Sequence, residues 1–162
     1  MNTAKTLELL RSEAADIRMC ELYGADKAEE NIRRYEDLVQ KFQENFGEKD
    51  ILMFSSPGRT EISGNHTDHN HGKVLAGSIN LDCVGIAAKN ESSKVNIISE
   101  TFHQKFTIDL NDLQPSAKKA GTVDLVKGLL KGFQESGYEV GGFDAYICLL
   151  YTSPSPRDAT LS

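Results

Sequence analysis

The chain has 162 residues, of which 39% are apolar, and a formal net charge of −6 at pH 7. This length suits one domain, and the acidic balance excludes the dense cationic face that nonspecific nucleic-acid binding needs. Three widely spaced cysteines predict neither a disulfide framework nor a paired-cysteine zinc site. Because the sequence has no apolar signal core and no run of membrane-span length, we expect a cytoplasmic protein with no membrane and no nucleic-acid partner.

The first quarter of the chain, residues 1–50, predicts a helical hairpin. Apolar residues recur at helical spacing over residues 3–19. Asp26 is then a plausible N-cap for a second helix, because Glu29 follows it at capping-box spacing. We expect Gly47 to end this helix. Its predicted apolar face consists of Ala28, Ile32, Tyr35, Leu38, Val39, Phe42 and Phe46.

After residue 50 the pattern changes to short strands. The apolar run 51–54 is predicted to stop in a turn at Ser55-Ser56-Pro57-Gly58. A helix that Thr122 caps and Gly137 ends is expected near the end. One or two strands are predicted over residues 74–88, and single strands over residues 95–99, 106–110 and 143–147. A helical hairpin, a run of strands, a helix and a strand together predict an α+β fold.

Residues 57–72 form a polar stretch between apolar strands, where functional groups are usually mounted. Its residue types permit a transition-metal site made of His66, His69 and His71 with Asp68. Three such ligands within six loop residues, however, lack a familiar metal spacing.

Two other interpretations of this stretch remain open on chemistry alone. In the first it recognises a polar ligand: Asp68 accepts hydrogen bonds from two neighbouring hydroxyls, and Arg59 supplies a fixed cation for a phosphoryl group. In the second it is a solvated turn with a structural arginine.

The stretch resembles the galactokinase signature, Gly-Arg-x-Asn-hydrophobic-Ile-Gly-Glu-His-Thr-Asp-Tyr-Asn-x-Gly followed by a strand. The matching residues are Gly58, Arg59, Ile62, Gly64, His66, Thr67, Asp68, Asn70, Gly72 and Leu75. The similarity covers about residues 5–147. Because this family belongs to the GHMP kinases, the resemblance implies an α+β GHMP-kinase N-terminal domain (ribosomal protein S5 domain 2-like). We expect it to be truncated, with an N-terminal helical hairpin and a mixed sheet covered by helices on one face.

The resemblance also implies a domain division. Residues 1–50 are the helical segment of the sugar-binding region, and residues 51–147 are a partial GHMP-kinase N-terminal domain. Residues 148–162 do not resemble the family and predict a non-native or disordered tail. The family's phosphate loop and its later catalytic-base Asp have no counterpart here, so we expect this fragment to be inactive by itself.

The implied activity is transfer of the ATP γ-phosphoryl group to the 1-hydroxyl of D-galactose. By resemblance, Arg59 stabilises the transition state and Ser99 is a weak match to a nucleotide contact. Mg²⁺ accompanies ATP, and no metal ligand is expected in this fragment. The residues implied to hold the sugar are Asn65, His66, Thr67 and Asp68.

Three positions depart from the family pattern: Glu61 replaces an Asn, Asn65 a Glu and His69 a Tyr. These changes leave the kinase class intact but keep other sugars open, including N-acetylgalactosamine or a related pyranose. A noncatalytic galactose-sensing regulator of the same family is also an open alternative.

Overall fold

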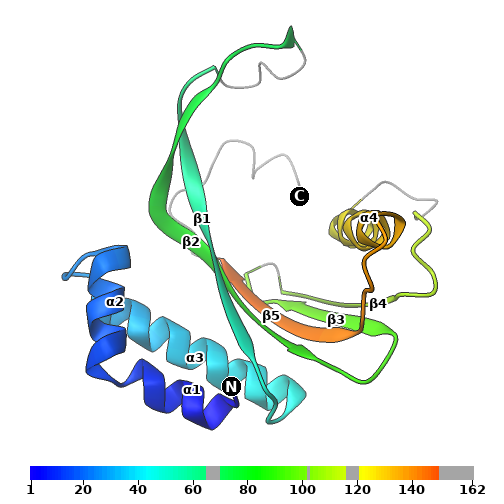
Figure 1. Cartoon of the computed structure of the whole chain (residues 1–162). Coiled ribbons are helices and arrows are strands. Elements are labelled where there is room, and N and C mark those ends of the chain that lie inside the picture. The colour runs from blue at the N-terminus through cyan, green and yellow to red at the C-terminus, as the bar shows by residue number, and fades with distance from the viewer. Residues whose placement is uncertain (65–69, 102, 116–120, 150–162) are drawn as a thin grey trace.

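The computed structural model describes residues 1–64, 70–101, 103–115 and 121–149 (Figure 1). Three helices come first: α1 (Thr3–Leu10), α2 (Glu13–Tyr23) and α3 (Ala28–Phe46). The strands β1 (Leu52–Ser63), β2 (Leu75–Lys89), β3 (Lys94–Ser99) and β4 (Gln104–Asp109) follow, then α4 (Thr122–Glu135) and β5 (Phe143–Leu149). The predicted α+β order is therefore confirmed.

Two local predictions in the helical hairpin were wrong. The expected helix over residues 3–19 is broken, because the Ser12 hydroxyl accepts from the Ala15 amide and caps a new helix, α2. The Asp26 capping box does not form. The amide of Asn31 bonds to the carbonyl of Lys27, so Lys27 occupies the N-cap and no side chain caps α3. Gly47 does end α3, with a φ of 78°. The expected cap at Thr122 was also wrong, because Gly121 is the N-cap of α4 and no side chain caps that helix.

The five strands form one sheet in the order β1-β2-β5-β3-β4. All neighbouring pairs are antiparallel except β3 and β5, which are parallel. β5 continues two residues past the predicted end at residue 147, and its last described pair is Leu149 opposite Cys83. β1 and β4 are the edge strands.

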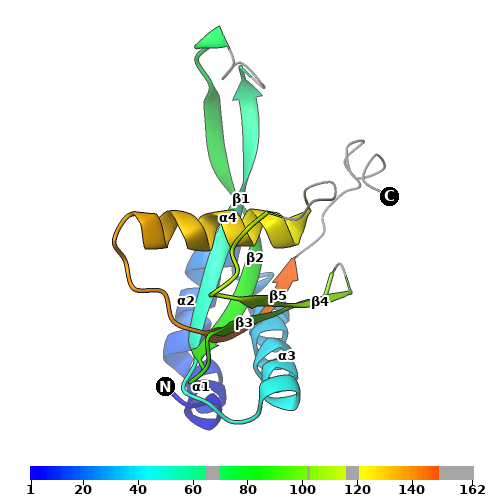
Figure 2. The same cartoon turned by 90° about the vertical axis from the view of Figure 1, so that its right-hand side faces the viewer.

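The sheet has helices on both faces, not on one face as expected, and the alternation of side chains along each strand explains this arrangement (Figures 1 and 2). On one face, α3 packs Leu38, Val39 and Phe42 against Val84 and Ile86 of β2. On the other, α4 packs over β3, β4 and β5. The buried residues of that second cluster include Val95, Ile97, Ile108, Leu130 and Ala145.

The predicted turn at residues 55–58 is also wrong, because β1 runs straight through it. Pro57 has no N–H to donate, but it lies on an edge strand, where this loss is tolerated. The register shifts between Pro57 and Arg59. At Gly58 a Cβ atom would lie 3.1 Å from the Leu81 carbonyl oxygen, so the glycine permits close approach of the two strands. The Pro-Gly pair therefore marks an irregularity inside a strand.

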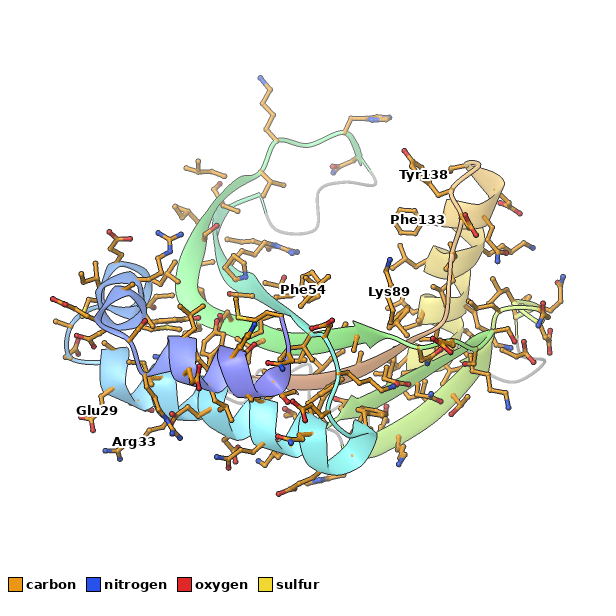
Figure 3. All side chains as sticks on the ribbon, turned by 60° about the horizontal axis from the view of Figure 1, so that its bottom comes forward. Glu29, Arg33, Phe54, Lys89, Phe133 and Tyr138 are labelled. Atoms are coloured by element: carbon orange, nitrogen blue, oxygen red, sulfur yellow. The ribbon has the colours of Figure 1, made fainter. Side chains whose placement is uncertain are left out.

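β1 and β2 extend beyond the rest of the sheet as a two-stranded hairpin, which we call the signature hairpin (residues 55–64 and 70–83) (Figure 2). Beside its base, the face of the sheet away from α3 exposes Leu52 and Phe54 of β1. Figure 3 shows Phe54 on this side of the sheet, with Phe133 of α4 and Tyr138, which follows α4, across from it.

Candidate functional site

Arg59 lies on the β1 arm of the signature hairpin, opposite Ser78 and just beyond the register shift. Its Nε donates to Glu61 Oε1 over 3.3 Å. The two residues share a face because side chains two apart in a strand point the same way. The Arg59 side chain is 74% exposed and that of Glu61 is 24% exposed. Arg59 is thus a solvent-facing cation held loosely by one carboxylate.

Gly64 ends the β1 arm in a conformation that glycine favours. Its φ is 85°, and a Cβ atom there would lie 2.1 Å from the Lys73 carbonyl oxygen. His71, on the returning arm, is exposed with a φ of 57°. The four predicted sugar-binding residues lie between these two points in the sequence.

The four predicted sugar-binding residues lie outside the described residues, as does His69. Their roles therefore stay predictions, and so does the alternative metal site, which needs His66, His69 and Asp68. Among the residues that the structure describes, no group of three or more His, Cys, Asp and Glu side chains could hold a metal ion. The predicted sugar-binding residues are Asn65, His66, Thr67 and Asp68.

Ser99 is half-buried at the end of β3. In the sheet it lies in one row with Ile147, Gly85 and Phe54, as the register of successive strand pairs shows. Arg59 is five residues further along β1 than the last member of this row. The sheet register therefore does not bring Ser99 and Arg59 together, and the nucleotide contact of Ser99 stays a prediction.

A buried polar cluster at the base of the signature hairpin was not found from the sequence. Asp82 is only 4% exposed. Its carboxylate accepts hydrogen bonds from the Tyr23 hydroxyl (2.6 Å), Arg34 Nη1 (2.7 Å) and the Ser55 hydroxyl (2.5 Å). The hydroxyls of Tyr23 and Tyr35 form a hydrogen bond of 2.9 Å. The sequence does contain one indication of this cluster, since Asp82 lies inside the apolar run Leu81–Ala88. An Asp that is buried there needs hydrogen-bonding or charged partners, because Asp is almost never fully buried unless paired.

The cluster shifts two pKa values in opposite directions. Burial by itself would raise the pKa of Asp82, but the hydrogen bonds from Ser55, Tyr23 and Arg34 outweigh it and hold that pKa below its usual range. Burial, followed by the hydrogen bond to Asp82, raises the pKa of Tyr23 well above its ordinary value. Asp82 is therefore an ionised, fully engaged acceptor at neutral pH.

A second buried carboxylate, Asp144 of β5, is 3% exposed. It accepts hydrogen bonds from Lys49 Nζ (2.5 Å), Asn90 Nδ2 (2.9 Å) and Asn96 Nδ2 (2.7 Å). Burial would raise its pKa, but these donors lower it. Through Lys49, this cluster connects the segment between α3 and β1 to β5. It lies at the end of the sheet opposite to Asp82, and we assign it a structural role.

The fold is that of a truncated N-terminal domain of the GHMP kinases. The crystal structure of Methanococcus jannaschii mevalonate kinase has the same fold over 64% of this chain and 34% of that one, with a TM-score of 0.51 at 12% identity. In the part of the chain that the structure describes, no helix is long and apolar enough to cross a membrane.

The galactokinase galactose-binding signature matches residues 40–89. The Lactococcus lactis subsp. lactis galactokinase is 38% identical over 122 residues, which are 73% of this chain and 30% of the relative. The Clostridium tetani galactokinase is 34% identical over 117 residues, 72% of this chain and 30% of the relative. The crystal structure of Lactococcus lactis galactokinase complexed with galactose matches 75% of this chain and 32% of that one, with a TM-score of 0.64 and 35% identity.

The chain is therefore similar to galactokinases over about three quarters of its length, as the resemblance predicted. It spans about 30% of the length of the curated relatives it matches.

Proposed function

We propose that this chain provides the sugar-binding segment of a galactokinase, which transfers the γ-phosphoryl group of ATP to the 1-hydroxyl of D-galactose. One observation carries this proposal: the galactose-binding signature over residues 40–89 includes the exposed hairpin on which Arg59 is mounted. The similarity to a galactokinase whose crystal structure contains galactose supports the choice of sugar.

In this proposal Arg59 stabilises the transition state. Phosphoryl transfer spreads negative charge over the equatorial oxygens of the transferred group, and a positioned guanidinium matches that charge. Two features support the role. The Arg59 side chain is 74% exposed, and its 3.3 Å contact to Glu61 uses only Nε. Among the described residues, this contact leaves the other guanidinium nitrogens to a phosphoryl group.

The sugar is held, in the same proposal, by the residues that follow Gly64. Asp68 accepts from two adjacent sugar hydroxyls. Because a carboxylate left without these partners costs free energy, it rejects sugars of the wrong stereochemistry. Neighbouring side chains complete the sugar contacts. They are Asn65, His66 and Thr67.

The co-substrate is ATP with Mg²⁺, which would neutralise charge on the phosphates when bound. The described residues contain no group of three or more His, Cys, Asp and Glu side chains suited to a metal. Ser99 is a weak candidate for a nucleotide contact. We propose a cytoplasmic location and expect little turnover from these 162 residues by themselves.

Calorimetric titration of the purified chain with D-galactose tests the proposal. We expect saturable binding that Asp68→Asn weakens about tenfold or more, because the amide cannot accept both hydroxyl hydrogen bonds. The matched control is Asp109→Asn on β4, at the other edge of the sheet, which should bind galactose like the wild type. Absent galactose binding, or equal affinity in Asp68→Asn and the wild type, would overturn the proposal.

A further inference from the structure

The β1 arm of the signature hairpin has little in its own sequence to set its register. Strand register is normally specified by apolar residues that alternate toward a core, and a slip of one residue turns every side chain to the other face. Residues 55–61 read Ser-Ser-Pro-Gly-Arg-Thr-Glu and have no such alternation. β1 is also an edge strand, and its register already shifts once after Pro57. A specific contact must therefore position this arm.

Asp82 lies at the right point to do so. It is the partner of Pro57 in the last regular β1–β2 pair before the shift that leads to Arg59. Its Oδ2 accepts from the Ser55 hydroxyl of β1 and from the Tyr23 hydroxyl of α2. One carboxylate oxygen thus joins the hairpin arm to the helix layer.

Arg34 of α3 holds the other side of the same residue. Its Nη1 donates to Asp82 Oδ1 over 2.7 Å, and its Nη2 donates to the Asp82 backbone carbonyl over 2.9 Å. The second bond positions the β2 backbone itself. It does so one residue before Cys83, where the described pairing of β2 with β5 ends. A bidentate guanidinium imposes direction as well as charge.

From this arrangement we infer that Asp82 is a positioning residue: it sets the register of the signature hairpin and its orientation relative to the helix layer. Buried ion pairs seldom stabilise a fold more than apolar packing would, and their best-attested role is to specify one arrangement among several. A register error at Asp82 would carry Arg59 to the opposite face of the hairpin. The positioning role of Asp82 is independent of the proposed function. Only the effect of a register error on phosphoryl transfer rests on it.

Two neighbouring serines allow a matched test of this inference. Both serines are exposed residues, but Ser55 donates to Asp82 and Ser56 points to the other face of β1. Ser55→Ala removes one donor from the cluster. Ser55→Thr keeps the hydroxyl in a residue that suits a strand. Ser56→Ala makes the same change as Ser55→Ala, but on the face of β1 that points away from Asp82.

Hydrogen exchange of the whole 162-residue chain, followed by NMR or mass spectrometry, is the measurement. In Ser55→Ala we expect amides of residues 59–63 and 75–78 to exchange about tenfold faster, because local opening of the hairpin becomes easier. Exchange in α1, α2 and α3 should stay at wild-type rates. Ser55→Thr and Ser56→Ala should both show wild-type exchange throughout.

Equal hairpin exchange in Ser55→Ala and Ser56→Ala would overturn the inference. A uniform acceleration that includes the helices would also overturn it, because the cluster would then contribute only global stability. Since no ligand is added, these outcomes are independent of galactose binding. A chain that fails to bind galactose but shows the expected exchange pattern would contradict the proposed function alone.

Discussion

Position 61 is where this chain changes the immediate surroundings of the proposed catalytic arginine. Galactokinases usually carry an uncharged Asn there, by the resemblance described above, whereas Glu61 places a carboxylate 3.3 Å from Arg59 Nε. A phosphoryl group approaching Arg59 must therefore compete with a resident anion. The pair is solvent-exposed on the arginine side, so this competition is modest.

We predict that Glu61→Gln strengthens the response of Arg59 to inorganic phosphate. Removal of a surface ion pair of this kind should lower the half-saturating phosphate concentration by about two- to fivefold. The Arg59 Hε signal in NMR titrations of the chain reports it. Glu139→Gln, an exposed substitution far along the sequence, is the control. An unchanged titration midpoint in Glu61→Gln would contradict the prediction.

At the scale of elements, the signature hairpin depends on one backbone conformation at its tip. Gly64 has a φ of 85°, and the Lys73 carbonyl oxygen occupies the space where a Cβ atom would go. Gly77, on the other arm, has open space around it and no positive φ. The two glycines look alike in sequence, but only Gly64 is required by the geometry of the hairpin.

Gly64→Ala should therefore destabilise the chain by about 1–3 kcal/mol, the usual cost of forcing a non-glycine residue into a strained conformation. Gly77→Ala should change the free energy of unfolding by less than about 0.5 kcal/mol. Urea unfolding followed by circular dichroism measures both. Equal stability of the two variants would show that the hairpin tip rearranges without cost.

For the whole molecule, the two buried carboxylates link stability to pH. The folded-state pKa values of Asp82 and Asp144 are both held below their usual range by hydrogen-bond donors. A depressed pKa gives stability that is fully present above the unfolded-state value of about 3.9 and is lost as pH falls through the folded-state value. The chain should therefore lose stability below about pH 4.

Asp144→Asn should reduce this acid dependence. The folded wild type resists protonation at Asp144, so the unfolded state takes up more protons in acid. The slope of the unfolding free energy against pH reports the number of protons taken up on unfolding. In acid we expect this number to be smaller in the variant by up to about one proton. Urea unfolding between pH 7 and the acid limit of folding provides the measurement, and identical slopes in both proteins would rule out the contribution of Asp144.

The sequence by itself determined the features that depend on near neighbours. The apolar face of α3, its end at Gly47, the order of strands and helices after α3, and the resemblance carried by residues 58–75 all follow from local periodicity, turn chemistry or a contiguous motif. Each was predicted because the information lies within one turn, one strand or one loop.

Only the tertiary structure decided where the Pro57-Gly58 pair falls, which faces the helices cover and how Asp82 is satisfied. A Pro-Gly pair predicts a turn locally, but pairing with β2 is stronger and converts it into a register shift. The donors to Asp82 lie 59, 48 and 27 residues away in sequence, at Tyr23, Arg34 and Ser55. No local pattern encodes such contacts, because they exist only once the helix layer has packed on the sheet.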